Sequence, residues 1–371
     1  MRVLVLSANT GAGHNTAARA LEEQMQKNNI ECHVWDALSF ISETASRLVS
    51  EGHTQFYRHF PKLFGLIYRF EEKHSNKWLY DLCAKGAEAM HERLLTEPFD
   101  AIICTHTFSA MMLTAFRRRY EDRTPAYFVA TDYTASPGVS DSDLDMYFVP
   151  HRMLFAEFIR CGIAADRMVA SGIPICEKFY RPLSKVGARE ALQLPREGKM
   201  VLLSGGSMGA GNLDRAALHL IDSLPNDAYL VVICGQNEKT YRALLPHACE
   251  RLYVLGFTDQ IDAYMSAADL YITKPGGLTT SEAIAKRTPM LFVNAVPGCE
   301  TRNYDFLIRS GVAAGAMSWK DAVDKTYTML SKPALLEEQV AAMERFSEQR
   351  ATEIICRHLQ KEIRPLTVLN G

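Results

Sequence analysis

Short apolar runs rich in β-branched residues alternate with stretches of helical periodicity along nearly the whole chain. Such alternation predicts stacked β-α-β units, in which helices cover both faces of a parallel sheet. The predicted strands are RVLVLSA, CHVWDAL, AIICTHT, AYFVATD and DMYFVP in the first half, and VLLSGG, YLVVICG, LYVLGF, LYITKPG and MLFVNA in the second. Several of these strands run into glycine or aspartate, so we expect an α/β fold with ligands at the carboxyl edge of each sheet.

The chain is long enough for two domains, because 371 residues with 47% hydrophobic content exceed what one core usually supports. A stretch rich in proline and turn residues, SGIPICEKFYRPLS, begins at Ser171 and marks the predicted boundary. We therefore expect an N-terminal domain over residues 1–170 and a C-terminal domain over residues 171–349.

Each half opens with a strand, a glycine-rich loop and a helix. The first loop carries Gly11 and Gly13, and the second begins with Gly205, Gly206 and Ser207. Glycine lets backbone N–H groups approach a ligand, and the N-terminus of the following helix adds partial positive charge. Either loop is therefore suited to a phosphate group, although neither contains the lysine of a P-loop.

The segment KPGGLTTSE, residues 274–282, favours the C-terminal half as the nucleotide site. It is typical of a strand end that turns into a helix, with the turn formed by Gly276, Gly277, Leu278 and Thr279. Glu282 then falls in the first turns of the helix, where a carboxylate can accept both ribose hydroxyls while the terminal amides face a diphosphate. The alternative is an ordinary capping box made by Thr279 and Glu282.

The composition of the chain excludes some classes of partner and identifies none. The formal net charge of -2 provides no global attraction to nucleic acid, so we expect no nucleic-acid partner. The nine cysteines form no C-x-x-C pair and are typical of reduced thiols in a cytosolic protein. No stretch approaches the roughly 20 apolar residues needed to cross a bilayer, and the apolar run from Val3 to Leu6 is too short for a signal peptide, so we expect none. We therefore predict a cytoplasmic chain whose membrane contact, if any, is peripheral.

The motifs GAGH, GGS-x-G, PGGLTTSE and PGCETRN together resemble the monogalactosyldiacylglycerol synthase and processive diacylglycerol glucosyltransferase family, within glycosyltransferase family 28. THTF, TDY, SGIPI and CGQNEK extend the similarity over nearly the whole chain, and the peptidoglycan lipid-linked N-acetylglucosaminyltransferase is a more distant relative. This resemblance implies a GT-B fold, with two Rossmann-like domains and a cleft between them. It also implies a UDP-sugar donor, no metal or other cofactor, inversion at the anomeric carbon and a lipid acceptor such as diacylglycerol. The final helix, within residues 350–371, would pack back on the N-terminal domain.

The resemblance also assigns roles to residues of the C-terminal half. Gly205, Gly206 and Ser207 would contact the diphosphate, and Glu282 the ribose. The turn containing Phe257 and Thr258 would flank the uracil. Glu300 and Asn303 would bind hydroxyls of the donor sugar. Cys299 stands where the family usually carries glutamine, so the sugar, whether glucose, galactose or an N-acetylhexosamine, stays open.

Transfer to a hydroxyl requires a base, and His14 is the first candidate. Its predicted place at the N-terminus of a helix disfavours imidazolium and keeps the ring neutral near pH 7. Asp132, at the end of a predicted strand, is the second candidate, and His106 is the third. An alternative role for His14 is to cap the helix or to bind the acceptor head group.

The segment from Phe56 to Phe70 interleaves aromatic and basic side chains, as interfacial segments do. We expect it to contact the acceptor lipid and an anionic membrane surface at the inner face of the cell membrane, mainly through Phe60, Lys62, Phe64, Tyr68 and Arg69, together with Gly11 and Gly13. An aromatic stripe of this kind can also be ordinary core. The family's His-x-x-Trp is replaced here by Ala135 to Gly138, so acceptor identity is open.

Other functions fit the residues less well. A dinucleotide site over Gly11 and Gly13 lacks its third glycine, since Thr16 stands there. A calcium loop over Asp141 to Asp145 lacks the required glycine and glutamate. A UDP-sugar epimerase of the same fold is the main alternative, because fold alone does not separate it from a transferase. A transferase acting on a polyprenyl-linked or soluble acceptor is another.

Overall fold

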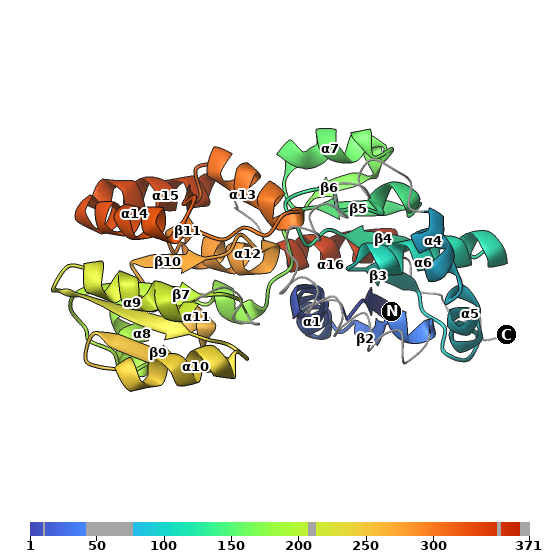
Figure 1. Cartoon of the computed structure of the whole chain (residues 1–371). Coiled ribbons are helices and arrows are strands. Elements are labelled where there is room, and N and C mark those ends of the chain that lie inside the picture. Colours follow the sequence, from blue (N-terminus) through green and yellow to red (C-terminus); the bar gives the residue numbers. More distant parts are fainter. Residues whose placement is uncertain (10–11, 42–76, 207–212, 347–349, 364–371) are drawn as a thin grey trace. The chain divides into compact units, whose positions relative to one another are not determined.

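The structure is a computed structural model that describes residues 1–9, 12–41, 77–206, 213–346 and 350–363 (Figure 1). Contacts within the chain group it into two compact units. Unit 1 comprises residues 1–177, 297–299 and 349–371, and unit 2 comprises residues 178–296 and 300–348. Along the sequence, the two segments of unit 2 thus alternate with the three segments of unit 1.

Unit 1 is built on a six-stranded, entirely parallel sheet with the order β2-β1-β3-β4-β5-β6. Its strands are β1 (Arg2–Ser7), β2 (Glu31–Asp36), β3 (Ala101–Cys104), β4 (Ala126–Val129), β5 (Met146–Val149) and β6 (Met168–Ala170). Its described helices are α1 (Ala12–Lys27), α4 (Lys77–Ala84), α5 (Ala87–Thr96), α6 (Thr107–Tyr120), α7 (Phe155–Arg160) and α16 (Ala351–Glu362). Four short 3-10 helices fill the connections: Ala37–Phe40, Val139–Asp141, Arg152–Leu154 and Ala165–Arg167.

Unit 2 repeats this plan with the order β12-β11-β10-β7-β8-β9, again entirely parallel. Its strands are β7 (Lys199–Ser204), β8 (Ala228–Ile233), β9 (Leu252–Leu255), β10 (Leu270–Thr273), β11 (Met290–Phe292) and β12 (Ala314–Gly315). Its helices are α8 (Lys185–Ala191), α9 (Leu213–Ser223), α10 (Glu238–Leu244), α11 (Ile261–Ala267), α12 (Gly277–Lys286), α13 (Cys299–Arg309), α14 (Trp319–Ser331) and α15 (Pro333–Phe346). Two 3-10 helices, Glu177–Tyr180 and Leu245–His247, complete the described elements.

The α/β prediction is confirmed, and all ten predicted strands form. The two strands that the sequence pattern missed, β6 and β12, are both edge strands and span only three and two residues. Runs this short do not show a periodicity that can be distinguished from a loop.

The C-terminal helix completes the core of unit 1. Ile355, Cys356 and Leu359 of α16 are fully buried and pack in one cluster with apolar residues of α1 and of strands β1, β3, β4 and β5. In unit 2, the apolar faces of α9 and α14 pack against β7, β8 and β10. Both sheets are therefore rigid platforms, and their strand ends are fixed in position.

A buried ion pair joins the amino ends of the strands in unit 2. Asp269, which precedes β10, accepts hydrogen bonds through Oδ2 from Arg189 Nη2 and from the Met200 backbone N–H, both at 2.8 Å. Arg189 is 3% exposed and also donates to the carbonyl oxygens of Ala267, Arg196 and Gly198. The half-exposed Lys185 reaches the other oxygen of Asp269 at 2.6 Å.

We predict that Asp269→Ala lowers the free energy of unfolding by about 3–5 kcal/mol, because it leaves the Arg189 charge buried without its counter-ion. Lys185→Met removes only the exposed member of the cluster and should cost at most about 1 kcal/mol. Urea denaturation followed by circular dichroism measures both. Equal losses in the two variants would show that the buried pair contributes no more than a surface pair.

Candidate functional site

Two side chains and one backbone carbonyl group meet at the carboxyl edge of the sheet in unit 1. His14 lies in the first turn of α1, after β1, and Thr105 and Thr131 follow β3 and β4. These three strands are neighbours in the sheet. His14 Nδ1 lies 2.9 Å from the Thr105 carbonyl oxygen and 2.9 Å from the Thr131 hydroxyl.

This contact fixes the tautomer of His14. A carbonyl oxygen can only accept a hydrogen bond, so Nδ1 carries the proton and the Thr131 hydroxyl shares it. In the neutral form of this ring the basic atom is Nε2. The ring is partly exposed, and His106 packs against it edge to face with the ring centroids 4.4 Å apart. These contacts fix the position of the His14 ring at the carboxyl edge of the sheet in unit 1.

The remaining candidates of unit 1 are placed as follows. His106 is the N-cap of α6 and accepts a hydrogen bond at Nδ1 from the Phe108 backbone N–H at 3.0 Å, which gives it a structural task. Asp132 directly follows Thr131 and is partly exposed, and Gly13 precedes His14 within α1. Six of the residues predicted to contact the acceptor lipid and the membrane lie outside the described residues: Gly11, Phe60, Lys62, Phe64, Tyr68 and Arg69.

The corresponding edge of unit 2 is rich in glycine. Gly206 follows β7 with φ +76°, a conformation that favours glycine, and its N–H donates to the Ser204 hydroxyl at 3.2 Å. Ser207 lies outside the described residues. A Cβ atom added at Gly206, at Gly256 after β9 or at Gly276 after β10 would meet no atom within 4 Å. Among the described residues, no neighbouring atom fills the space beside the backbone of Gly256 or Gly276. That space is therefore open to a ligand.

The turn after β9 shows the same openness. Phe257 is 68% exposed, although an aromatic ring of its size is usually at least partly covered. Thr258 accepts a hydrogen bond from the Gln260 backbone N–H at 3.1 Å, which fixes the end of this turn. An exposed aromatic ring on a fixed turn is a suitable surface for a planar base.

Helix α12 begins at Gly277, and its N-cap is Gly276. The capping-box alternative for Thr279 and Glu282 is therefore wrong, because the helix starts three residues before that box requires. Leu278 is buried, and Thr279 lies within the first turn. With no side chain capping the helix, the first amides of α12 are available to an anion.

Glu282 lies in the second turn of α12, and its environment is unusual for a carboxyl group. Burial raises its pKa to about 8, against a smaller opposing effect of the Lys178 ammonium. A carboxyl group whose charged form is disfavoured by burial is costly to the fold, and such groups are concentrated at functional sites. A vicinal diol that donates two hydrogen bonds would relieve this cost.

Glu300 and Asn303, both in the first half of α13, differ in accessibility. Glu300 forms an ion pair with Lys274, with Oε1 at 3.1 Å from Nζ, and its Oε2 accepts a hydrogen bond from the Val296 backbone N–H at 2.9 Å. Asn303 is 0% exposed and donates through Nδ2 to the Pro275 carbonyl oxygen at 3.0 Å. The Asn303 amide thus supports the turn before α12.

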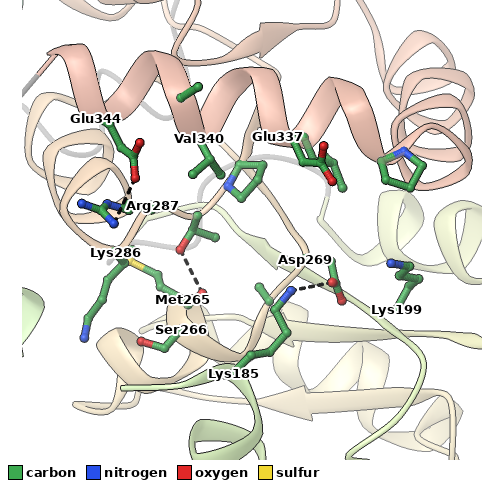
Figure 2. A pocket seen from close by; sticks show the side chains of 16 residues that line it. Lys185, Lys199, Met265, Ser266, Asp269, Lys286, Arg287, Glu337, Val340 and Glu344 are labelled. Atoms are coloured by element: carbon green, nitrogen blue, oxygen red, sulfur yellow. Dashed lines mark hydrogen bonds and ion pairs between the residues drawn. The ribbon is translucent and has the colours of Figure 1, made fainter. Parts of the chain in front are cut away.

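A cavity of about 510 Å³ occurs at the opposite, amino edge of unit 2 (Figure 2). It is bordered by Lys199 and Asp269, which stand at the amino ends of β7 and β10. The Lys185–Asp269 and Arg287–Glu344 ion pairs cross its walls (Figure 2). The cavity therefore lies away from the glycine-rich edge and belongs to the structural ion-pair cluster.

Sequence reasoning did not single out Thr105 and Thr131 at the carboxyl edge of the sheet in unit 1, or Lys274 at that edge in unit 2. Thr105 and Lys274 directly follow β3 and β10, and Thr131 stands two residues after β4, so a position just past a strand end is the signal that could have identified them. Among the described residues, no group of three or more histidine, cysteine or acidic side chains could hold a metal ion. In the same part of the chain no helix is both long and apolar enough to cross a membrane.

Two family models match the chain in succession. Residues 14–175 match monogalactosyldiacylglycerol (MGDG) synthase, and residues 200–298 match the glycosyltransferase family 28 C-terminal domain. A processive diacylglycerol beta-glucosyltransferase of Bacillus cytotoxicus is 28% identical over 92% of this chain and 89% of its own length. The enzyme of the same name from Staphylococcus aureus strain JH9 is 24% identical over 96% and 92%.

Solved structures show the fold. MurG of Acinetobacter baumannii aligns with a TM-score of 0.66 and 18% identity, covering 97% of this chain and 99% of MurG. A UDP-GlcNAc 2-epimerase of Neisseria meningitidis aligns with a TM-score of 0.63 and 14% identity over 97% and 100%. With two parallel six-stranded sheets and these neighbours, the predicted GT-B fold is confirmed. The consecutive family matches and the nearly full-length relatives together show that the chain belongs to the family 28 glycosyltransferases that include the monogalactosyldiacylglycerol synthases and the processive diacylglycerol glucosyltransferases.

Proposed function

We propose that this glycosyltransferase moves a hexose from a UDP-sugar to diacylglycerol with inversion at the anomeric carbon, giving a glycosyldiacylglycerol. The names of its relatives support diacylglycerol as the acceptor and a hexose as the transferred group. The observation that carries the proposal is the desolvated Glu282 carboxyl beside an uncapped helix N-terminus and an open glycine edge. Together these features suit a nucleoside diphosphate.

On the donor side, the diphosphate binds to the amides of Gly205, Gly206 and Ser207 and to the N-terminus of α12, formed by Gly276, Gly277, Leu278 and Thr279. Glu282 accepts hydrogen bonds from both ribose hydroxyls. The exposed Phe257 ring and Thr258 contact the uracil. Glu300 binds the sugar, and Asn303 supports the turn behind it.

On the acceptor side, Nε2 of His14 takes the proton from the lipid hydroxyl as its oxygen attacks the anomeric carbon. The bond between that carbon and the diphosphate breaks, and UDP leaves with the bonding electron pair. Fixed amides and the dipole of α12 stabilise the negative charge that develops on the leaving group. Asp132 is the alternative base, and its position after β4 places it beside Thr131.

We also propose that the protein works in the cytoplasm, bound peripherally to the anionic inner face of the cell membrane. Phe60, Lys62, Phe64, Tyr68 and Arg69 supply aromatic and basic side chains for this contact, and Gly11 and Gly13 lie in the loop before the base. An acceptor dissolved in a bilayer can only be reached by a protein that docks on its surface.

Product analysis tests the proposal directly. Purified protein is incubated with UDP-glucose, UDP-galactose or UDP-N-acetylglucosamine, with and without vesicles that contain diacylglycerol and anionic phospholipid. A glycolipid formed from one donor supports the proposal and identifies the sugar. Isomerisation of the donor sugar that does not depend on lipid would identify an epimerase instead. Transfer only to a polyprenyl-linked or soluble acceptor would contradict diacylglycerol as the acceptor.

We predict that His14→Ala lowers kcat by about 10²–10⁴-fold, as expected for loss of a general base, while UDP affinity is unchanged. Calorimetric titration with UDP and initial rates with vesicles measure the two effects. His219→Ala, at an exposed position of α9, is the matched control and should retain full activity. If Asp132→Asn abolishes turnover and His14→Ala does not, then Asp132 is the base.

We predict that affinity for a UDP-sugar rises with pH and levels off above about 8, the pKa to which burial raises Glu282. Ribose hydroxyls bind the ionised carboxylate, so at lower pH binding must first remove its proton, and affinity falls about tenfold per pH unit well below the pKa. Calorimetry between about pH 6 and pH 9 measures this dependence. Glu282→Gln should bind weakly at every pH, and a Gln variant with an unchanged pH slope would exclude this role.

The same raised pKa has a consequence for stability. The folded protein keeps the proton of Glu282 up to a pKa of about 8, whereas the unfolded chain loses it in the ordinary carboxyl range. The contribution of Glu282 to stability is therefore most favourable at acidic pH and decreases as pH rises toward 8. At pH 8 the free energy of unfolding of Glu282→Gln should exceed that of the parent by at least about 1 kcal/mol, so the variant should unfold at a higher urea concentration. At pH 5 the two proteins should differ little.

A further inference from the structure

The segment that opens unit 2 lies along the face of α12 that carries Glu282. Lys286, four residues after Glu282, shares that face, and its Nζ donates to the Arg181 carbonyl oxygen at 3.0 Å. Arg181 directly follows the 3-10 helix Glu177–Tyr180, which contains Lys178. The backbone from Lys178 to Arg181 is therefore held beside the carboxyl group that we assign to the ribose.

The ammonium group of Lys178 is fixed from a second side by the turn after β9. Its Nζ donates to the Asp259 carbonyl oxygen at 2.5 Å and lies 3.8 Å from Oδ1 of Asp262, in the first turn of α11. Helix α11 packs against α12. The Lys178 side chain is 36% exposed, so water partly screens its charge, but two contacts hold that charge in place.

Charged and titratable groups surround Glu282 on several elements. Burial raises the pKa of its carboxyl group to about 8, the Lys178 ammonium lowers that pKa, and the Asp262 carboxylate raises it. The buried hydroxyl of Tyr271 on β10 also interacts with Glu282, and Lys286 lies one turn further along α12. Of the groups that shift this pKa, Lys178 is the one that favours the charged carboxylate.

We propose that Lys178 is a positioning residue for nucleotide binding that acts through Glu282. Its anchored ammonium group is the counter-charge for the Glu282 carboxylate when that carboxylate accepts the two ribose hydroxyls. The inference rests on the proposed function, which assigns Glu282 to the ribose. Hydroxyls bind the ionised carboxyl group most strongly, so a fixed positive charge nearby stabilises the bound state. In Lys178→Met, the nucleotide must bind a carboxyl group that gives up its proton less readily.

Two other roles for Lys178 lead to different predictions. As a ligand of the diphosphate, its ammonium group would act whether or not the ribose carries hydroxyls. As a purely structural link between the turn after β9 and α11, it would act through its ion pair with Asp262, and loss of either partner would have the same effect. A counter-charge for Glu282 instead predicts opposite effects for the two partners, because Asp262 disfavours the charged carboxylate.

The test is calorimetric titration of the full chain with UDP between about pH 6 and pH 9. In the parent, affinity should rise with pH and level off above about 8. Lys178→Met should move the midpoint of this rise to higher pH and weaken UDP binding at about pH 7 by at least about twofold, with a smaller loss at about pH 9. Asp262→Asn should move the midpoint to lower pH and strengthen binding at about pH 7. Lys178→Arg keeps the charge and should keep the midpoint of the parent.

A second ligand separates a counter-charge from a phosphate contact. The analogue 2′,3′-dideoxy-UDP contains the diphosphate but lacks both ribose hydroxyls, so its binding does not require Glu282 to ionise. The parent and Lys178→Met should therefore bind this analogue with equal affinity.

Lys325→Met is the matched control. Lys325 Nζ donates to the Gly315 carbonyl oxygen at 2.6 Å and pairs with Asp321 at 2.9 Å, and its side chain is 42% exposed, so it repeats the contacts of Lys178. It belongs to α14, and the groups that shift the Glu282 pKa do not include it. This variant should leave UDP affinity unchanged at every pH. Melting temperatures separate loss of folding from loss of binding, and Lys178→Gln replaces Lys178→Met if that protein does not fold.

An unmoved midpoint in Lys178→Met overturns the proposal. Together with an equal loss of affinity in Asp262→Asn at every pH, it identifies a purely structural link. A loss of affinity for the dideoxy analogue as large as the loss for UDP also overturns the proposal and identifies a ligand of the diphosphate. Failure of the proposed function looks different, because the parent itself then binds no UDP or binds it without dependence on pH.

Discussion

The parallel arrangement of the strands is the constraint on which the rest of this structure depends. Within each sheet every strand runs in the same direction, so every chain segment that leaves a strand leaves it at the carboxyl edge of that sheet. His14, Thr105 and Thr131 come from three separate stretches of sequence and meet because β1, β3 and β4 are neighbours. The glycines after β7, β9 and β10 are brought together in the same way. A reactive group needs only to follow a strand in order to reach the site.

The two edges of the sheet in unit 2 differ in how their buried carboxyl groups are paired. At the amino edge, the buried Asp269 carboxylate pairs with Arg189 and Lys185 and accepts a backbone N–H, so its charge is stabilised within the protein. At the carboxyl edge, Glu282 is desolvated and its charged form is disfavoured. The first arrangement stabilises the fold and the second prepares a place for polar groups of a ligand. Such a division is expected when a rigid sheet supports a site that is itself unfavourable to the fold.

Much of the fold could be predicted from the sequence, because buried parallel strands appear as apolar runs that contrast with their surroundings. The edge strands β6 and β12 were too short to produce that contrast. The motifs indicated which loops carry chemistry, but not strand order, and strand order decides that Thr131 rather than a nearer residue in sequence contacts His14. The start of α12 and the buried face of α13 were also hidden, because both depend on tertiary packing. For this reason the capping box was placed wrongly and the inward direction of Asn303 was not anticipated.

Closure of the core of unit 1 by α16 has a consequence for the order in which the protein is made. Ile355, Cys356 and Leu359 leave the ribosome after every residue of unit 2, yet they fill the interior of the sheet that was synthesised first. Unit 2 can fold while its last segment is still close to the ribosome, since domains fold as units during synthesis. Unit 1 must wait for its final helix with an apolar face of its sheet uncovered. The nascent chain therefore carries an exposed hydrophobic surface on its first sheet until α16 has been synthesised.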